Sequence, residues 1–307
     1  MIVLGFDTSN YTTSIAYYDG NNALNCSQLL PVKLGELGLR QSDAVFHHTK
    51  SLPELSGRLF SHLSDGRIAA IGVSTRPRAV EGSYMPCFLV GYSHAKLLSD
   101  TLGVPLIQCS HQQGHVAAAL WSAGKMELLE QPHLAWHLSG GTTELLLVEP
   151  EGHNVKCTRI GGTSDISAGQ LIDRAGQLLH LPFPSGKHLD TLSADAHRTD
   201  VFHVKCQKMD FSLSGVQNKV QQYYADIGDP AETAAYTLRC VSSAVYTATQ
   251  NALKEYPDLP VVFSGGVASN TILRKTLAQI KPIFAQPQYS TDNALGIAIL
   301  AHRALEE

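Results

Sequence analysis

Two histidines within residues 110–115 have the spacing of a chelating pair. On a helix, residues four apart share one face, with about 5–6 Å between their Cβ atoms, so His111 and His115 could bind one metal ion or phosphate group together. A zinc peptidase helix carries a glutamate next to the first histidine as its general base, and here Gln112 stands in that place. Peptide hydrolysis is therefore disfavoured. A metal or phosphate site and a helix start with locally hydrogen-bonded histidines both stay open from these residues alone.

Three polar turns, each placed after an apolar run, are suited to holding a nucleotide. Glycines let the backbone approach phosphate oxygens, hydroxyl groups donate hydrogen bonds to them, and a carboxylate can hold a cation beside them. The first turn contains Asp7, the second reads Ser139-Gly140-Gly141-Thr142, and the third has Gly265 and Gly266 before a predicted helix. Strand, Gly-Gly, helix is an order that presents backbone N–H groups to an anion. The sequence has neither a Walker A motif nor G-x-G-x-x-G, which disfavours the P-loop and dinucleotide-binding classes.

The elements that must position these residues follow from hydrophobic periodicity and turn signals. Strands at residues 2–6 and 12–18 predict a hairpin with the Asp7 carboxylate in its bend, and strands at 133–138 and 144–148 predict a second hairpin of the same kind. The two hairpins indicate an internal duplication. Further strands are expected at residues 68–74, at 104–109 and from 261, and helices at 49–63, 89–102, 171–181, 231–254, 271–280 and 291–305.

This arrangement predicts where the candidate ligands lie. The strand at 104–109 would deliver His111 to its carboxyl end, the side of an α/β sheet where ligands usually bind. The last helix is expected to begin at residues 290–293 with capping residues that leave Asp292 near the positive helix end. We expect two related α/β lobes, residues 1–120 and 132–289, with a cleft between them and a terminal helix, residues 290–307, packed back on the first lobe.

The composition is typical of a globular enzyme. The net charge of −4 over 307 residues shows no overall electrostatic footprint of a nucleic-acid-binding protein. Six cysteines without a C-x-x-C pair argue against a disulfide framework and a cysteine zinc site, and they fit a reducing cytosol. The apolar start has no basic segment before it, and no run approaches a membrane span, so we expect a cytoplasmic location without membrane contact.

In their order along the chain, these motifs resemble the TsaD family, the tRNA threonylcarbamoyl transferases that were once described as O-sialoglycoprotein endopeptidases. The resemblance spans nearly the whole chain. It rests on Gly5-Phe6-Asp7-Thr8-Ser9, Ser110-His111-Gln112-Gln113-Gly114-His115, Leu138-Ser139-Gly140-Gly141-Thr142, Gly169-Gln170-Leu171-Ile172-Asp173, Pro184-Ser185-Gly186, Phe211-Ser212-Leu213-Ser214-Gly215, Gly265-Gly266-Val267-Ala268-Ser269-Asn270 and Thr291-Asp292-Asn293.

The resemblance implies an α/β protein of the actin-like, Hsp70-like ATPase fold with two duplicated ribonuclease-H-like lobes. It implies transfer of threonylcarbamoyl from its adenylate to N6 of the adenosine beside the tRNA anticodon, with accessory proteins of tRNA modification as further partners. One divalent metal, Fe or Zn with Mg as a third candidate, would be held by His111, His115 and Asp292. An adenine nucleotide, ATP or the acyl-adenylate, would contact Asp7, Ser139, Gly140, Gly141, Thr142, Asp173, Gly186, Asp190, Gly265, Gly266 and Asn270.

Several motifs depart from the family pattern. The family string Cys-Asp-Glu-Thr after the first strand is replaced at residues 10–13, which include Thr12; a family histidine is Thr142; and a family glutamate is Gln170. A lysine is also lost within residues 214–218, and the glycine-rich loop after the strand at 68–74 becomes residues 76–84 with Arg76-Pro77-Arg78. Such replacements remove acid/base groups or charge partners. Two hypotheses follow: threonylcarbamoyl transfer or a closely related acyl-adenylate reaction, and a diverged nucleotide- and metal-binding paralogue that acts through a protein partner without modifying tRNA.

Overall fold

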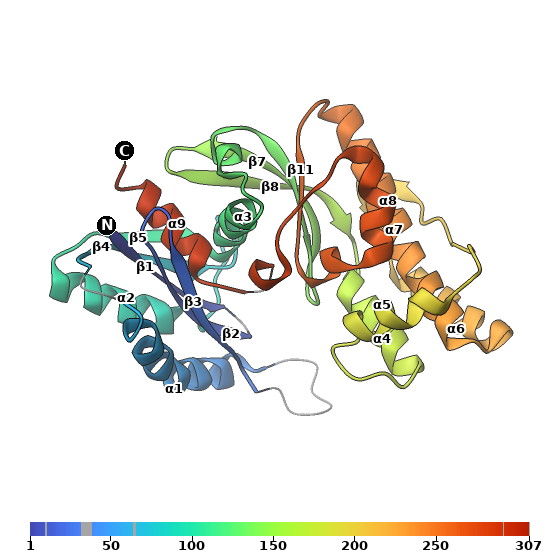
Figure 1. Cartoon of the computed structure of the whole chain (residues 1–307), viewed down its shortest axis with the longest axis horizontal. Helices are drawn as coiled ribbons and strands as arrows, with labels where there is room; N and C mark the ends of the chain where they lie inside the picture. The colour runs from blue at the N-terminus through green and yellow to red at the C-terminus, as the bar shows by residue number, and fades with distance from the viewer. Residues whose placement is uncertain (10, 32–38, 64–65, 291, 307) are drawn as a thin grey trace. The chain divides into compact units, whose positions relative to one another are not determined.

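The computed structural model describes residues 1–9, 11–31, 39–63, 66–290 and 292–306. The chain forms two compact units, each with its own sheet (Figure 1). Unit 1 comprises Met1–Gln131, Glu149–Cys157 and Asp292–Glu307, and unit 2 comprises Pro132–Val148 and Thr158–Thr291. Among the described helices, none is both long and apolar enough to cross a membrane.

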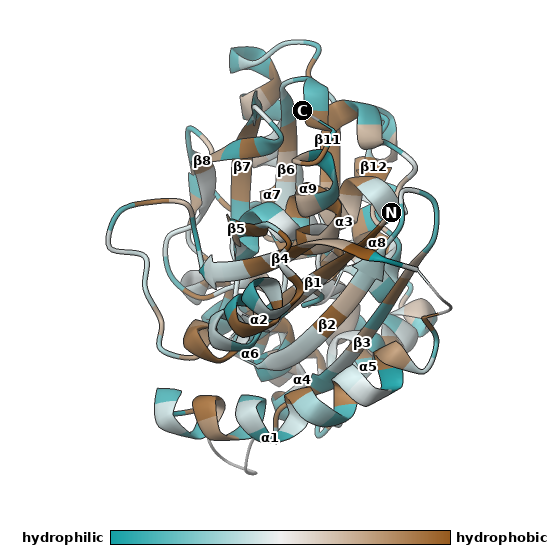
Figure 2. Ribbon diagram, turned by 90° about the vertical axis from the view of Figure 1, so that its left-hand side faces the viewer, coloured by the Kyte–Doolittle hydropathy of each residue, from teal (hydrophilic) through white to brown (hydrophobic). Residues whose placement is uncertain are grey.

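The sheet of unit 1 has five strands in the order β3-β2-β1-β4-β5. Their bounds are β1 Ile2–Ser9, β2 Thr12–Tyr18, β3 Ala23–Leu29, β4 Ile68–Arg76 and β5 Leu106–Ser110. The central strand β1 pairs antiparallel with β2 and parallel with β4. Its residues after Ile2 are all buried, which explains the apolar run at the start of the sequence and the brown colour of most of β1 in Figure 2.

Helices pack on this sheet through apolar faces. In α1, Gln41–Phe60, the buried residues Leu52, Leu55 and Leu59 join the core formed with β1 and β4. The helix α2, Phe88–Leu102, contacts β1 and β4, and it ends at Gly103 in the left-handed conformation. The helices α3, His111–Ser122, and α9, Leu295–Arg303, pack against each other, and α9 also contacts β1 and β4.

The sheet of unit 2 has the strand order β12-β11-β6-β7-β8-β10-β9. The strands are β6 His133–Leu138, β7 Thr143–Glu151, β8 Asn154–Thr163, β9 Cys206–Gln207, β10 Asp210–Phe211, β11 Val261–Ser264 and β12 Ile283–Phe284. Like β1, β6 pairs antiparallel with the strand that follows it and parallel with the strand that returns beside it, β11. The order β8-β7-β6-β11-β12 thus repeats that of unit 1, as the predicted duplication requires.

Unit 2 has helices α4 Ala168–Leu178, α5 Gly186–Leu192, α6 Ser214–Ile227, α7 Pro230–Glu255 and α8 Thr271–Leu277. The longest, α7, is capped by the Asp229 carboxylate, which accepts hydrogen bonds from the backbone N–H groups of Ala231 and Glu232. It contacts α4, α5, α6 and α8. Together with the fully buried Trp136 and Phe263 of the sheet, its apolar face forms the core of this unit.

Some predicted elements are right and others are wrong. The bounds of β2 and β6 are as predicted, and the predicted strands and helices elsewhere are present with shifted ends, as in α1, which begins at Gln41. The strands β3 and β8 and the helix α5 were not predicted. No strand or helix was predicted within residues 208–215, and they contain β10 and the start of α6. These segments lack a long hydrophobic period, so packing on neighbouring elements decides their structure.

Candidate metal centre

Side-chain caps fix the start of α3. The hydroxyl of Ser110 accepts a hydrogen bond from the Gln113 backbone N–H, and the Gln113 side-chain oxygen accepts one from the Ser110 backbone N–H, at 3.3 Å and 2.8 Å. This reciprocal pair is a capping box. The Gln113 amide also donates to the carbonyl of Val155 at 2.7 Å, within the segment Glu149–Cys157 that belongs to unit 1. His111 and His115 therefore lie one helical turn apart, on a helix whose start is held in place.

Asp292 reaches α3 because two helices cross at glycines. A Cβ atom on Gly296 of α9 would lie 1.8 Å from the Gly114 carbonyl oxygen of α3, so no side chain fits there. Before α9, the Ala294 N–H donates to Ser14 Oγ at 2.8 Å and to Asn25 Oδ1 at 3.0 Å. These contacts hold the segment that carries Asp292 against both α3 and the sheet of unit 1.

The predicted start of the last helix at residues 290–293, with Asp292 near its positive end, is wrong. The helix α9 begins at Leu295, its N-cap is Ala294, and no side chain caps it. The predicted first helical residue, Thr291, lies outside the described residues. Asp292 precedes the helix by three positions, so its carboxylate is directed to the histidines of α3 rather than to the N–H groups of α9.

The three side chains bring one donor atom each to a common point. The Nε2 atoms of His111 and His115 are 2.9 Å apart, and Asp292 Oδ1 lies 3.2 Å from His115 Nε2 and 3.5 Å from His111 Nε2. All three donor atoms lie within 4.8 Å of one another. The side chain of Asp292 is 29% exposed, so the cluster is accessible from solvent.

The carboxylate of Asp7 contacts the imidazole of His111 at Nδ1. The carboxylate is fully buried and accepts hydrogen bonds from the Nδ1–H of His111, at 3.0 and 3.1 Å to its two oxygens. The hydroxyl groups of Ser9, at 3.0 Å, and Ser74 also donate to it. Because a carboxylate can only accept, His111 carries a proton on Nδ1, and its Nε2, which would lose the second proton on binding a metal, faces Asp292 and His115.

This geometry corrects the predicted first hairpin. Asp7 was expected in its bend, but β1 continues to Ser9 and pairs Asp7 with Ser14 within the ladder. A carboxylate is normally excluded from a central strand, and here three donors compensate for its burial. Its full burial speaks against direct contact with a nucleotide, which the sequence predicted for it.

The charges in the cluster are coupled. Burial lowers the pKa of His111, but the carboxylates of Asp7 and Asp292 outweigh burial and raise it to about 10. Burial raises the pKa of Asp292, yet hydrogen bonds from His111 and His115 outweigh it, so its pKa lies well below the usual range. The two carboxylates thus stabilise a positive charge at the point where the donor atoms meet.

The donor set fits a divalent transition metal. Two imidazole nitrogens and one carboxylate oxygen are the ligands of many catalytic zinc and non-haem iron sites, and three protein ligands leave positions open for a substrate. In such sites a ligating histidine usually donates its other ring N–H to a carboxylate, a backbone carbonyl or a water, as His111 does to Asp7. Mg²⁺ prefers oxygen ligands, so the two nitrogens favour Fe or Zn.

Sequence reasoning missed three residues of this centre. Thr12 Oγ1 donates to Asp292 Oδ2 at 3.2 Å, and the hydroxyls of Ser9 and Ser74 hold Asp7. One signal was available for Ser74, since it stands at the predicted end of the strand that runs parallel to β1. Thr12 was noted only as a departure from the family pattern, and no sequence rule joins it to a residue 280 positions away.

In unit 2, the predicted nucleotide residues Ser139–Thr142 form the four-residue turn between β6 and β7. Leu138 pairs with Thr143 at the end of the ladder. The Ser139 N–H donates to the Thr142 carbonyl at 2.8 Å, and the Thr142 N–H donates to Ser139 Oγ at 3.1 Å. A Cβ atom on Gly140 or Gly141 would meet nothing within 4 Å among the described residues, so the turn is open on that side, while on its other side the Gly140 carbonyl accepts from Ser167 Oγ at 2.6 Å.

The third predicted turn lies beside the second. Gly265 has φ +94°, and a Cβ atom there would lie 2.1 Å from the Leu138 carbonyl oxygen, so the end of β11 touches the end of β6. Only glycine tolerates both conditions. The expected order of strand, two glycines and helix is modified, because a 3-10 helix, Gly266–Ser269, comes before α8.

The other predicted nucleotide residues are held by bonds within unit 2. Asp190 Oδ1 accepts from Asn270 Nδ2 at 2.7 Å, while Asn270 Oδ1 caps α8. Asp173 Oδ1 accepts from the Ser185 N–H at 2.8 Å, directly before Gly186, and burial raises the pKa of Asp173. Unit 2 therefore contains every predicted nucleotide residue except Asp7, which belongs to unit 1 with the metal cluster.

The departure at Gln170 has a structural explanation. Its side-chain oxygen accepts from the Ser167 N–H at 3.0 Å, and its N–H donates to Ser167 Oγ at 3.1 Å. This is a second capping box, in which glutamine and glutamate serve equally. The loss of the family's carboxylate at this position therefore leaves the start of α4 intact.

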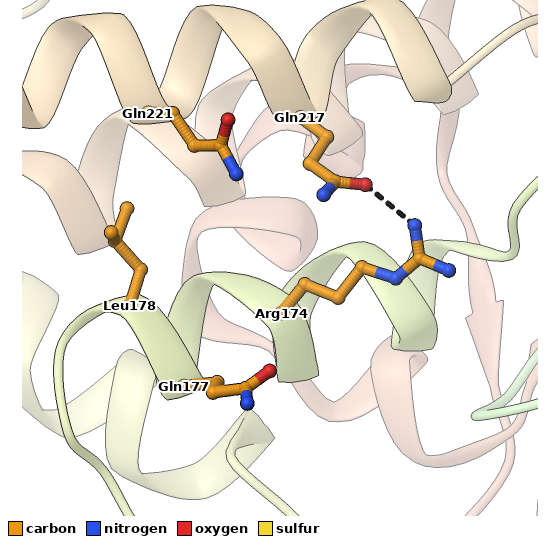
Figure 3. Close-up of a pocket in the computed structure, with 5 residues that line it drawn as sticks. All are labelled: Arg174, Gln177, Leu178, Gln217 and Gln221. Carbon is orange, nitrogen blue, oxygen red and sulfur yellow. Dashed lines mark hydrogen bonds between the residues drawn. The ribbon is translucent and has the colours of Figure 1, made fainter. Parts of the chain in front are cut away.

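A shallow hollow of about 360 Å³ lies between α4 and α6. It is lined by Arg174, Gln177, Leu178, Gln217 and Gln221 (Figure 3). Arg174 Nη1 donates to Gln217 Oε1 at 2.6 Å across it. None of the predicted site residues lines this hollow, so the sequence-based predictions do not involve it.

Comparisons with known proteins address the family directly. The sequence pattern of tRNA N6-adenosine threonylcarbamoyltransferase matches residues 38–299. Proteins of that name from Carboxydothermus hydrogenoformans and Sulfurihydrogenibium sp. are 30% and 31% identical to this chain. The alignments cover 99% and 100% of this chain and 92% and 91% of those proteins.

Solved structures show the fold. Full-length HypF, in a phosphate- and nucleotide-bound form, matches 99% of this chain with a TM-score of 0.63 at 14% identity, over 46% of its own length. A ROK hexokinase from Thermus thermophilus matches over the full length of both chains with a TM-score of 0.55 at 15% identity. The predicted actin-like ATPase fold is confirmed. Because the family's sequence pattern matches residues 38–299, and because relatives of that name align over nearly the whole chain, this chain belongs to the tRNA N6-adenosine threonylcarbamoyltransferase family.

Proposed function

We propose that this protein transfers the threonylcarbamoyl group from its adenylate to N6 of the adenosine beside the tRNA anticodon, with a divalent metal held by His111, His115 and Asp292. The proposal rests on two observations. The three ligand atoms lie within 4.8 Å of one another, and the Asp7 carboxylate orients His111 through a hydrogen bond from Nδ1. Family membership supports the substrate class.

Each residue of the cluster has a definite task in this proposal. His111 and His115 present Nε2 lone pairs, Asp292 presents Oδ1, and Thr12 occupies Oδ2, so that one carboxylate oxygen faces the ion. Bound there, the metal would supply a Lewis acid that polarises a carbonyl or phosphate oxygen of the adenylate. Asp7 keeps the proton of His111 on Nδ1 and thereby maintains the ligand tautomer.

The chemical change is an acyl transfer. The N6 nitrogen forms a bond to the carbamoyl carbon, the bond from that carbon to the phosphate oxygen of the adenylate breaks, and AMP and one proton are released. In unit 2, the open glycines of the turn Ser139–Thr142 and Gly266 would admit phosphate oxygens close to the backbone. Asp173, Gly186, Asp190 and Asn270 would contact the remainder of the adenine nucleotide.

The test is a modification assay with unmodified tRNA. The purified protein is supplied with ATP, threonine, bicarbonate, the enzyme that forms the adenylate and the accessory proteins of a tRNA-modification system, and the modified nucleoside is measured. We expect product with the wild-type chain and none with His111→Ala. A wild-type chain that leaves tRNA unmodified, while an established relative succeeds under the same conditions, overturns the proposal.

The second hypothesis, a nucleotide- and metal-binding paralogue that acts through a protein partner, draws support from Thr12. Where the family pattern has a carboxylate, this chain has a hydroxyl that binds Asp292 at 3.2 Å. A carboxylate available for acid/base work is thus absent from that position. Retained binding of metal and ATP without tRNA modification would favour this hypothesis, whereas turnover excludes it.

A further inference from the structure

A strip of cations runs along α7 in unit 2. We define this basic strip as residues 197–208 together with Lys219 of α6 and Arg239 of α7. It contains five lysines or arginines, Arg198, Lys205, Lys208, Lys219 and Arg239, and one carboxylate, Asp200. Of the cations only Arg239 is partly buried, and the other four are exposed. In a chain with a net charge of −4, such a local excess of positive charge is a distinct feature.

Hydrogen bonds fasten the strip to α7 along its length. The Glu232 carboxylate accepts from the N–H groups of His197 and Arg198, and His203 Nδ1 bonds to Ser243 Oγ at 3.0 Å. Asn251 Nδ2 donates to the Lys208 carbonyl at 2.7 Å. From residue 232 to residue 251, the helix rises by about 28 Å, so the strip is a long and ordered surface.

Asp200, the one carboxylate within the strip, already has hydrogen-bond and ion-pair partners in the protein. Asp200 Oδ2 accepts a hydrogen bond from the Tyr223 hydroxyl at 2.9 Å and lies 3.9 Å from Arg198 Nη1. Arg239 Nη1 donates to the Asp200 carbonyl at 3.2 Å. Among the described residues, Lys205 and Lys208 form no ion pair. Together with Glu232, which accepts from the N–H groups of His197 and Arg198, Asp200 offsets two of the five positive charges and leaves an excess of three.

An aromatic ring stands among these cations. Phe202 is 38% exposed, and Lys219 Nζ lies 5.7 Å from the centre of its ring. Cations that contact phosphates, together with an exposed aromatic ring on which a base can stack, are the combination by which proteins bind single-stranded RNA. A membrane surface or an acidic protein would use the charge but has no base to stack on the ring.

We propose that the basic strip binds the tRNA, with its lysines and arginines on backbone phosphates and Phe202 stacked on an unpaired base. The inference rests on the proposed function for its substrate class and adds a surface that the metal cluster and the glycine turns do not include. It is an electrostatic and stacking surface without base-specific hydrogen bonds, so it contributes affinity and position, and it leaves the chemistry to other residues.

The test measures tRNA binding as a function of salt. The triple variant Arg198→Gln, Lys205→Gln, Lys208→Gln is compared with a control that loses the same charge elsewhere, Lys50→Gln, Lys275→Gln, Lys281→Gln; all six residues are exposed. We expect the strip variant to lose at least about tenfold in affinity at low salt and its salt slope to fall by about 2–3, because three phosphate contacts are lost. The control variant should retain both the wild-type affinity for tRNA and the wild-type salt slope.

Phe202→Ala adds a second, independent readout. It should weaken binding about fivefold or more and leave the salt slope unchanged, since stacking releases no counterions. Thermal melts of all variants verify folding. The proposal is overturned if strip and control variants lose affinity equally, or if the slope of the strip variant equals that of the wild type.

The two proposals fail separately. If the wild type modifies tRNA and the strip variant has the same KM for tRNA as the wild type, the proposed role of the strip is wrong and the proposed function stands. If the wild type binds tRNA through the strip and yields no product, the proposed function is wrong. If the basic strip binds tRNA, the strip variant should have a higher KM for tRNA than the wild type in a turnover assay. Its kcat and its KM for the adenylate should stay close to the wild-type values.

Discussion

Asp7 and His111 are joined by a hydrogen bond of 3.0 Å from the imidazole Nδ1 to a carboxylate that has no access to solvent. The bond links the central strand of unit 1 to the first residue of α3. Since Ser9 and Ser74 hold the carboxylate from other sides, its orientation is set before any ligand arrives. The imidazole is thereby oriented with Nε2 toward His115 and Asp292.

Replacing this carboxylate should weaken the metal site. With Asp7→Asn, His111 loses a charged acceptor and its tautomer is no longer fixed, so we expect metal affinity to fall by about 10–100-fold. The dissociation constant can be measured by competition with a chelator of known affinity. Asp43→Asn, at an exposed position of α1, is the matched control and should bind as the wild type does. Equal affinity in all three proteins would contradict the positioning role of Asp7.

Metal uptake should depend on pH because a proton occupies the site first. With its pKa raised to about 10, His111 is protonated in the metal-free protein at neutral pH. Each bound ion must displace that proton, so affinity should rise by about tenfold per pH unit as pH increases toward 10. Calorimetry in two buffers of different ionisation enthalpy should give a release of about one proton per ion. A binding constant that is flat with pH would refute this prediction.

The crossing of α3 and α9 should tolerate no side chain. We expect Gly296→Ala to lower the free energy of unfolding by about 1–3 kcal/mol, because its Cβ would overlap the Gly114 carbonyl. The shift of α9 should also carry Asp292 away from His115 and reduce metal affinity. Gly57→Ala, in α1 with no atom near its Cβ among the described residues, should stabilise slightly. Chemical denaturation of the metal-free proteins measures both changes, and a stable Gly296→Ala variant would argue against this contact.

A buried histidine should make the fold sensitive to acid. His48 is fully buried, its Nδ1 bonds to Thr13 Oγ1 at 2.8 Å, and burial lowers its pKa to about 4. The unfolded chain takes up a proton near pH 6.5 while the folded one does not, so stability should be lost as pH falls from about 6.5 to 4, by up to about 3 kcal/mol.

His48→Asn should remove this part of the pH dependence while it retains a partner for Thr13. Urea unfolding at a series of pH values, with wild type and variant compared at each, isolates the contribution. If the two proteins lose stability in parallel between about pH 6.5 and 4, another group is responsible for the acid sensitivity.

Much of the local structure could be read from single stretches of sequence. The apolar run of β1, the turn Ser139–Thr142 and the helical start of α3 depend on neighbours within a few residues, and so their types could be predicted. Segments such as α5 and β9 could not, because they are short and polar and are stabilised by packing on other elements. The placement of Asp7 in a bend was wrong for the same reason, since its donors Ser74 and His111 are 67 and 104 residues away.

The sequence by itself determined the family, the fold class and the candidate ligands His111, His115 and Asp292, because residue types in a fixed order are a property of the chain. Only the tertiary structure decided that Asp7 supports His111, that Thr12 binds Asp292, and that Gly114 and Gly296 bring α3 and α9 into contact. It also assembled the basic strip, whose members come from residues 197–208, α6 and α7. Such contacts arise when the core packs and fixes distances between residues far apart in the chain, and no periodicity or spacing encodes those distances.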